Sequence, residues 1–387
     1  MTPKKFIQKL HLWLGFASGL VVLVVSLTGS LLVFEHELEE AVAHDRFFVQ
    51  SPGTGRLPAD ALLARVRAAY PGRRVIGFEM DANPRKTVRV LLDEPRTTVF
   101  VNPYSGQLQG EQAYDARFFT TVLKLHRYLL AKETGKAVTG VSCVVFVLML
   151  LSGVVLWWPR NAAFLRERLR IRVKARWRRV NYDAHSVAGF YAAFPLLVIA
   201  LTGLVWSYKP VNQAIFLLLD GKPQDKSRPA SVSTGGTPGP LTYETLVAQT
   251  HAQYAFPGDL TVTLPKDDTA SVVVAKEDLS AALPNVVSFL YFDQYSGKLL
   301  KAEPYATVSR GMKVRRAVYP IHTGSVGGVF TKIIALLVSL FAASLPVTGF
   351  LVWWGRRKKS THAVASPGRV PQHRRPRKVA GPRPEPA

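Results

Sequence analysis

The sequence is poor in cysteine and in acidic residues, and it lacks the glycine-rich loops of nucleotide-binding proteins. Cys143 is its only cysteine, which excludes a disulfide scaffold, a cysteine-based zinc site and the C-x-x-C-H attachment of a c-type haem. Neither G-x-G-x-x-G nor G-x-x-x-x-G-K-[ST] occurs, so a standard nucleotide-binding loop is excluded too. Asp and Glu number 26 against 50 Lys and Arg. Any redox or transport chemistry must therefore use other groups.

Four apolar stretches are each long enough to cross a bilayer, which needs about 20 residues per helix. Three carry no charged side chain, and the fourth is uncharged apart from whatever charge His185 carries. Most of the tryptophans lie at the ends of these stretches, where amphipathic rings favour the membrane interface. The sequence therefore predicts four transmembrane helices in a lipid bilayer, over residues 12–34, 137–158, 184–208 and 333–355.

Basic residues are concentrated in segment 1–10, in the loop 159–183 and in the tail 356–387. Lys and Arg are enriched in cytoplasmic loops, so both termini and this loop are expected on the cytoplasmic side. The net charge of +24 is then a signal of membrane topology. We expect no nucleic-acid partner, since that would need a folded basic surface. The tail is rich in proline and arginine and is expected to be disordered.

The two segments on the other side of the membrane show the same order of elements. The first has helical spacing over 59–70, strand patterns over 75–80, 87–93 and 97–102, and then a turn. The second has a helix over 243–254, strands over 260–264, 270–275 and 286–293, and an equivalent turn. Both turns read aromatic-x-[ND]-x-Tyr-Ser-Gly. Two α/β modules of common origin are therefore expected.

The spans repeat as well. Each has a hydroxyl-glycine pair near its C-terminal end and a histidine upstream. His11 precedes Gly29 by 18 positions, the spacing that also separates His185 from Gly203. His126 likewise precedes Gly153 by the spacing that separates His322 from Gly349. The expected fold is an α+β membrane protein: a four-helix transmembrane bundle with two external α/β modules, built as a parallel internal duplication.

Topology assigns the four histidines to two pairs. His11 and His185 open spans on the cytoplasmic side, whereas His126 and His322 precede spans that start outside. In a two-fold bundle, equivalent residues can face each other across the axis. Ionisable groups at membrane depth are costly and usually functional. Two imidazoles without a cysteine or carboxylate suit six-coordinate haem better than tetrahedral zinc. The alternative is that each histidine is an ordinary interfacial residue.

Six glycines support a cofactor between the helices, because a macrocycle needs places without side chains. Gly15 and Gly189 follow His11 and His185 by one helical turn on the same face. Gly29 and Gly203 follow the same two histidines by five turns, which is about 27 Å along the helix, and so reach the depth of the outer pair. Gly153 and Gly349 reach the depth of the inner pair in the same way. Alternatively, small residues in spans simply permit close helix packing.

These motifs, taken as an ordered set, resemble the PepSY-associated transmembrane family. The resemblance covers residues 1 to about 358, and the two Tyr-Ser-Gly turns make the external modules resemble PepSY domains. Within the family, the chain resembles the FoxB-type inner-membrane ferrisiderophore reductases. The motifs that carry it are His11-Leu-Trp-Leu-Gly15, Thr28-Gly29, Leu125-His126-Arg127, Ser152-Gly153, His185-Ser-Val-Ala-Gly189, His322-Thr-Gly324 and Thr348-Gly349.

The resemblance implies that His11, His126, His185 and His322 are axial ligands of two b-type haems per chain. It implies a bacterial inner-membrane oxidoreductase that passes electrons to a ferric siderophore, or another iron chelate, in the periplasm. The electron donor is left open between a quinol and a cytoplasmic reductase. Arg127 and Arg316, near the outer pair, are candidates for contact with haem propionates or an anionic chelate. The alternative for both arginines is an ordinary interfacial charge.

Two other functions are weighed against this one. A cofactor-free PepSY sensor or protease-regulating membrane protein would tolerate replacement of the histidines. A transporter fits less well, because no span carries the Asp, Glu or Lys of an ion-coupled pathway. In each case the expected segments are the N-terminus with the first span (1–34), the first module (35–125), the second span with its lead-in (126–158), the basic loop (159–183), the third span (184–208), the second module (209–321), the fourth span with its lead-in (322–355) and the tail (356–387).

Overall fold

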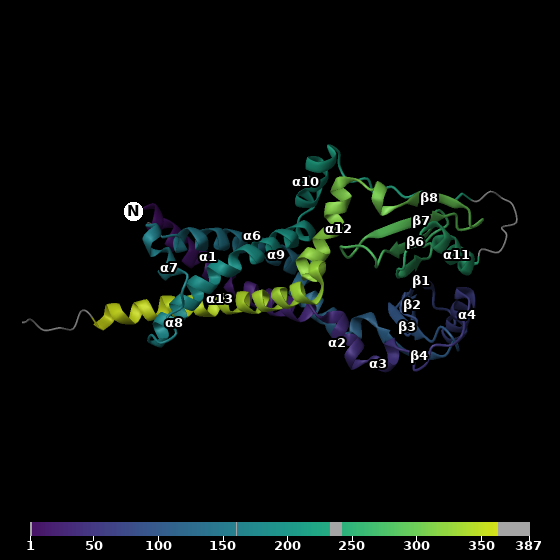
Figure 1. The fold of residues 1–387 in the computed structure, drawn as a ribbon, viewed down its shortest axis with the longest axis horizontal. Coiled ribbons are helices and arrows are strands. Elements are labelled where there is room, and N and C mark those ends of the chain that lie inside the picture. Colours follow the sequence, from purple (N-terminus) through teal and green to yellow (C-terminus); the bar gives the residue numbers. More distant parts are fainter. Residues whose placement is uncertain (1, 160, 233–241, 363–387) are drawn as a thin grey trace, which may run out of the picture.

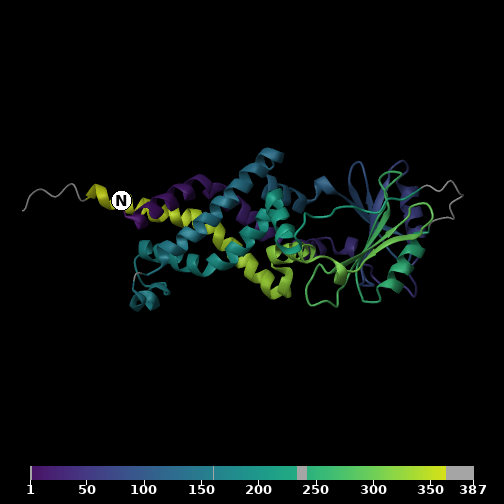
Figure 2. The ribbon, with the colours of Figure 1, turned by 90° about the horizontal axis from the view of Figure 1, so that it is seen from above.

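The computed structural model describes residues 2–159, 161–232 and 242–362, with side chains as far as Arg356. A helical bundle forms one half of the molecule and a β-sheet lies beyond one end of it (Figures 1 and 2). Within the described residues, four helices are long and apolar enough to cross a membrane. This confirms the prediction of four spans. They are α1 (Pro3–Leu32), α6 (Lys132–Trp157), α9 (Gly189–Ser207) and α13 (Gly328–His362).

The bundle is suited to a lipid environment. α1 packs against α6 and α13, and α9 packs against the same two helices. Small and aliphatic side chains, among them Leu196 and Ala342, fill the interior. Large apolar side chains point outward instead, and Leu20 and Phe194 are each 76% exposed. So much apolar surface on a helix exterior requires a non-aqueous surrounding.

Short helices surround both ends of the bundle. At the sheet end lie α2 (Glu35–Val42), α3 (His44–Phe47), α5 (Phe118–Tyr128), α10 (Lys209–Asp220) and α12 (Arg310–Thr323), with 3₁₀ turns at Tyr114–Ala116, Tyr305–Thr307 and Ser325–Gly327. The opposite end, where α1 begins and α13 ends (Figure 1), holds a 3₁₀ turn at Ala162–Phe164, α7 (Leu165–Arg168) and α8 (Trp177–Asp183). α8 continues into α9 through a π-helical turn at Ala184–Ala188.

Two helices at the sheet end lead into the second and fourth spans. The sequence placed His126 and His322 ahead of these spans without assigning the lead-ins a conformation, and the structure shows α5 and α12 as separate helices. The chain turns away at Leu129 and at Gly324, both of which have a positive φ. A residue in the left-handed conformation ends a helix because it turns the chain away. The N–H groups that follow it can then no longer donate to the carbonyls four residues back. His126 and His322 therefore lie on helices distinct from the spans that follow them.

The external segments form one antiparallel sheet with the strand order β4-β3-β2-β1-β5-β6-β7-β8. The strands are β1 (Val75–Met80), β2 (Val88–Leu92), β3 (Thr97–Val101), β4 (Leu108–Ala113), β5 (Leu260–Thr263), β6 (Val272–Glu277), β7 (Val287–Phe292) and β8 (Leu299–Glu303). Six of these were predicted. β4 and β8 were missed, because both are edge strands whose partly or fully exposed residues give no alternating pattern.

The sequence predicted two modules, and the structure joins them through β1 and β5. Phe78 pairs with Val262 in this central pair. A Cβ on the neighbouring Gly77 would lie 2.6 Å from the Val262 carbonyl oxygen, so only glycine permits the approach. The helices α4 (Ala59–Ala69) and α11 (Tyr243–Gln253) also cap each other: Ala59 N–H donates to Glu244 Oε2 at 2.7 Å, and Tyr243 N–H donates to Asp60 Oδ1 at 3.0 Å.

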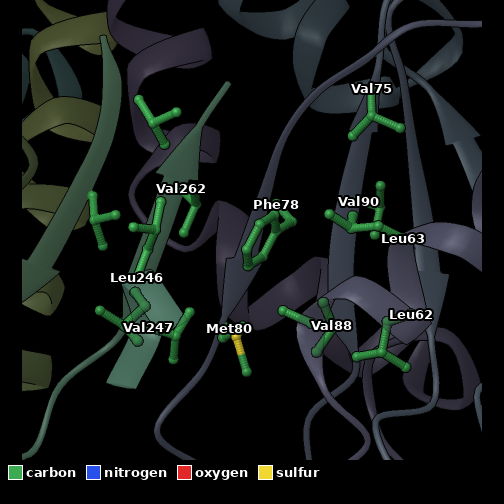
Figure 3. Close-up of a cluster of buried hydrophobic side chains, with 14 of the residues drawn as sticks. Leu62, Leu63, Val75, Phe78, Met80, Val88, Val90, Leu246, Val247 and Val262 are labelled. Atoms are coloured by element: carbon green, nitrogen blue, oxygen red, sulfur yellow. The ribbon is translucent and has the colours of Figure 1, made fainter. Parts of the chain in front are cut away.

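One hydrophobic core spans both modules. Figure 3 shows Phe78 between Val262 of β5 and Val90 of β2, its partners in register. Leu62 of α4 and Leu246 of α11 belong to the same buried cluster, so both helices cover one face of the sheet. The predicted Tyr-Ser-Gly turns are equivalent in geometry, since Asn102 and Asp293 each accept backbone N–H bonds from the two residues before the glycine. The tail over 356–387 was predicted to be disordered, but α13 continues through its first residues, 356–362, as helix. Residues 363–387 lie outside the described residues.

Candidate functional site

The structure places the four histidines of the spans in two pairs. His126 of α5 and His322 of α12 face each other at the sheet end, with ring centroids 6.3 Å apart and ring planes at 68°. His11 of α1 and His185, in the π-helical turn, lie toward the opposite end, where each ring contacts the hydroxyl-glycine pair of a neighbouring span. A π-helical turn adds a residue to the helix and is frequent at functional sites. We call these the outer and the inner pair.

Hydrogen bonds fix the protonation state of the outer pair. His126 Nδ1 lies 2.9 Å from the Val25 carbonyl oxygen and 3.2 Å from Thr28 Oγ1. His322 Nδ1 lies 3.0 Å from both the Ile199 carbonyl oxygen and Thr202 Oγ1. A carbonyl can only accept, so Nδ1 of each ring carries the proton. In the neutral imidazole, Nε2 then keeps its lone pair for a metal.

The inner pair is held by hydroxyl groups. His11 Nδ1 lies 2.8 Å from Ser152 Oγ, and His185 Nδ1 lies 2.8 Å from Thr348 Oγ1. Each hydroxyl donates its own hydrogen to a carbonyl of its helix, Ser152 to Met149 and Thr348 to Ser344. The oxygen therefore accepts a hydrogen bond from Nδ1–H. The Nε2 lone pair is again left for a ligand.

The glycine of each hydroxyl-glycine pair makes room for the imidazole beside it. A Cβ would lie 3.1 Å from His126 Cε1 at Gly29 and 3.4 Å from His322 Cε1 at Gly203. The inner pair repeats this, at 3.5 Å between Gly153 and His11 and 3.2 Å between Gly349 and His185. The glycines lie at the expected depths, but their immediate neighbour is an imidazole. Gly15 and Gly189 instead approach Met149 and Leu345.

A cavity of about 470 Å³ is lined by both outer histidines. Gly29, Gly203 and Trp206 contribute to the same walls. Among the described residues, no three His, Cys, Asp or Glu side chains gather to hold a metal by themselves. The two outer imidazoles, with ring centroids 6.3 Å apart and a cavity beside them, would suit a group that brings its own further ligands to a metal, such as a haem.

Both predicted arginines line this cavity. Arg316 donates to the Val287 carbonyl at 2.6 Å and pairs with Glu303 at 3.3 Å, and burial lowers the pKa of its guanidinium. The Arg127 guanidinium lies 5.1 Å from the Tyr128 ring centroid. Sequence reasoning missed a third arginine, Arg315, although it adjoins Arg316 in the chain. Trp206 was interpreted only as an interfacial anchor, yet its ring centroid lies 5.1 Å from that of His322.

The other described histidines lie apart from the two pairs. His36 and His44 are exposed on α2 and α3, and His44 stacks on Phe48. His251 is exposed on α11, where its Nδ1 accepts a hydrogen bond from the buried Lys276 Nζ at 3.0 Å. His373 lies outside the described residues, and the side chain of His362 is not described.

Comparison with known proteins gives one result that covers most of the chain. The family described as PepSY-associated TM region matches residues 8–356. This range includes α6 and α9, nearly all of α1 and α13, both modules and both histidine pairs. No curated protein sequence matches the chain.

Proposed function

We propose that this chain, which belongs to the PepSY-associated transmembrane family, is a di-haem b-type electron-transfer protein that reduces a periplasmic ferric siderophore and so releases its iron. The observation that carries the proposal is the state of the four imidazoles. Each presents Nδ1–H to an acceptor, which leaves Nε2 as a donor atom. Metal-bound histidines almost always hold their second nitrogen in this way.

His126 and His322 would hold one haem, and His11 and His185 the other. Bound haem supplies reversible one-electron chemistry at its iron, with a potential set by the ligands, burial and nearby charge. The chain's own residues supply the setting. The carbonyls of Val25 and Ile199 raise the basicity of the outer imidazoles, and the hydroxyls of Ser152 and Thr348 orient the inner ones.

Arg127 and Arg316 line the outer cavity and provide positive charge there. They suit haem propionates or an anionic chelate. Iron reduction would loosen a siderophore, because its hard oxygen ligands favour the ferric ion. The FoxB-type resemblance points to the same substrate class. The donor of electrons would be a quinol or a cytoplasmic reductase acting near the inner pair.

The orientation proposed is that of a bacterial inner-membrane protein with both termini in the cytoplasm and the sheet in the periplasm. Residues 161–183 of the basic segment lie at the end of the bundle opposite the sheet (Figure 1), which agrees with the enrichment of Lys and Arg in cytoplasmic loops. The two halves would derive from a parallel duplication. In support, the same two contacts occur in each half. In the first half, His11 contacts Ser152-Gly153 and His126 contacts Thr28-Gly29. In the second half, His185 contacts Thr348-Gly349 and His322 contacts Thr202-Gly203.

The test is a reduced-minus-oxidised absorption spectrum of the purified protein together with a pyridine haemochrome count. The proposal predicts about two b-type haems per chain, as two imidazole pairs require. His126→Ala and His185→Ala should each remove one of them. A colourless protein after haem-supplemented expression would contradict the proposal. It would leave the cofactor-free PepSY sensor or protease regulator, in which the histidines are dispensable.

A further inference from the structure

A second pocket, of about 340 Å³, opens beside the outer pair where α9, α10 and α12 meet. Trp206 and Lys209 line it from the end of α9 and the start of α10, and Arg315 lines it from α12. Lys226 and Gln224 come from the segment that follows α10. Val205, Asn212 and Gln213 complete the wall.

The pocket is strongly positive. Lys209, Lys226 and Arg315 line it, whereas no Asp or Glu does. None of these three cations forms a salt bridge within the described part of the chain, whereas Arg89 of β2, Lys301 of β8 and Arg316 of α12 each have an acidic partner. Unpaired like charges that share one pocket repel one another, so an anion bound among them would be stabilised.

Hydrogen bonds hold this wall in place. Arg315 Nε donates to Asn212 Oδ1 at 2.7 Å, and Asn212 Nδ2 donates to Gln224 Oε1 at 3.3 Å. Gln224 N–H in turn donates to Gln213 Oε1 at 3.2 Å. The segment that carries Lys226 is thereby tied to α10. The Arg315 bond uses only Nε, so the two terminal nitrogens of the guanidinium remain as a fork for a carboxylate, hydroxamate or similar oxygen pair.

Trp206 and Arg315 connect this pocket to the outer cavity, because both residues line both spaces. The Arg315 guanidinium lies 5.7 Å from the Trp206 ring centroid. The Trp206 ring also contacts the His322 ring edge-on, with an angle of 83° between the ring planes. A ligand in the second pocket would therefore be separated from the outer histidine by a single indole.

We propose that this pocket is a binding site for an oxygen-rich polyanion. The assignment of that polyanion as an anionic iron chelate rests on the function proposed above, since the pocket adjoins the outer pair through Trp206. A lipid headgroup phosphate has the same recognition chemistry, and the experiment below separates the two ligands.

The experiment uses the full chain in phosphatidylcholine nanodiscs and a redox-inert probe, tris(oxalato)chromate(III). Binding of this trianion is measured by equilibrium dialysis with chromium analysis, and hexaamminecobalt(III) serves as a cation of equal and opposite charge. We expect saturable binding of the trianion at one site and none of the trication. Arg315→Gln and Lys226→Gln should each lower the affinity about 3- to 10-fold, because each removes one charge-assisted contact. Added salt should weaken binding as well.

Lys298→Gln is the matched control, because it removes the same charge from an exposed position at the opposite end of β8 from α12. It should leave the affinity unchanged. Lys226 is exposed, so its variant tests the pocket even where Arg315→Gln disturbs folding. The proposal would be overturned if the trianion showed no saturable binding. It would also be overturned if Lys226→Gln, Lys298→Gln and the unaltered protein bound the trianion with equal affinity.

Repeating the measurement in nanodiscs that contain phosphatidylglycerol identifies the ligand. Retained binding supports a soluble chelate, whereas loss of binding would show that lipid phosphate fills the pocket and would overturn the chelate assignment. Neither readout depends on haem. A haem-free protein that binds the trianion would refute only the proposed function, and a haem-loaded protein that does not bind it would refute only this inference.

Discussion

Replacement of Gly29 by alanine tests whether the hydroxyl-glycine pairs exist to seat the histidines. The added Cβ would lie 3.1 Å from His126 Cε1. Ordinary carbon contacts begin near 3.4 Å, so the imidazole must retreat by about 0.3 Å. Both acceptors of its Nδ1–H, the Val25 carbonyl and Thr28 Oγ1, belong to the same helix as Gly29. The retreat therefore lengthens both bonds.

The lengthening matters most at Thr28. Its 3.2 Å bond would reach about 3.5 Å, the limit of a useful hydrogen bond. Overpacking by one methyl group in a packed interior costs about 1–3 kcal/mol. Alanine itself favours a helix over glycine by about 1 kcal/mol, so the free energy of unfolding must be compared with that of another glycine-to-alanine variant in a span.

Gly355→Ala is that control, because its Cβ would meet nothing closer than Arg178 Cδ at 3.7 Å. Thermal unfolding in one detergent and haem content are measured for both variants. Relative to Gly355→Ala, Gly29→Ala should be less stable by about 1–3 kcal/mol and should lose haem from the outer site. Gly153→Ala, with 3.5 Å of clearance from His11, should resemble the control. If Gly29→Ala also behaved like the control, the seating role of the glycine would be refuted.

Three further predictions concern other contacts. Ser152→Ala should destabilise the protein by about 1–3 kcal/mol, because it removes the acceptor of His11 Nδ1–H. Thr28→Val should cost only about 1 kcal/mol or less, because His126 Nδ1–H keeps the Val25 carbonyl as its acceptor. The unfolding midpoints of the two variants distinguish these outcomes. Gly77→Ala should break the joint between β1 and β5, since its Cβ would lie 2.6 Å from a backbone oxygen that cannot move aside; hydrogen exchange should show lost protection at Phe78 and Val262, and unchanged protection would disprove the claim. Burial raises the pKa of Asp259, so the native state binds more protons than the unfolded state and stability falls as pH rises through the native pKa. Asp259→Asn keeps the acceptor for Ala82 N–H and should raise the unfolding temperature at pH 7, and this advantage should vanish as pH falls below the ordinary aspartate range near 3.9.

Much of the architecture follows from patterns that the sequence displays openly. The four spans are visible because each apolar run exceeds the membrane thickness. The central strands are visible because fully buried residues such as Val88, Val90 and Leu92 alternate with only partly buried ones. By contrast, the edge strands β4 and β8 bury little and give no such pattern. The joint of the two modules was also missed, because pairing between β1 and β5 is a contact of high sequence separation.

The candidate site was predictable in its residues and less so in their roles. Equal spacings in the two halves singled out the histidines and the glycines. Spacing cannot show that His126 Cε1 rests against Gly29, because this depends on α5 being a separate helix that turns back at Leu129. Trp206 and Arg315 were missed for a related reason. Each has an ordinary explanation as a residue at a span end, and only the fold brings Arg315, Trp206 and His322 together.

The most direct test of the central claim is a low-temperature electron paramagnetic resonance spectrum of the oxidised protein. Four imidazoles with free Nε2 atoms predict two low-spin ferric centres with bis-imidazole ligation. His126→Ala should abolish the signal of one centre and His185→Ala that of the other. A wild-type spectrum with only high-spin iron, or with no haem signal, would contradict the assignment of these histidines as axial ligands.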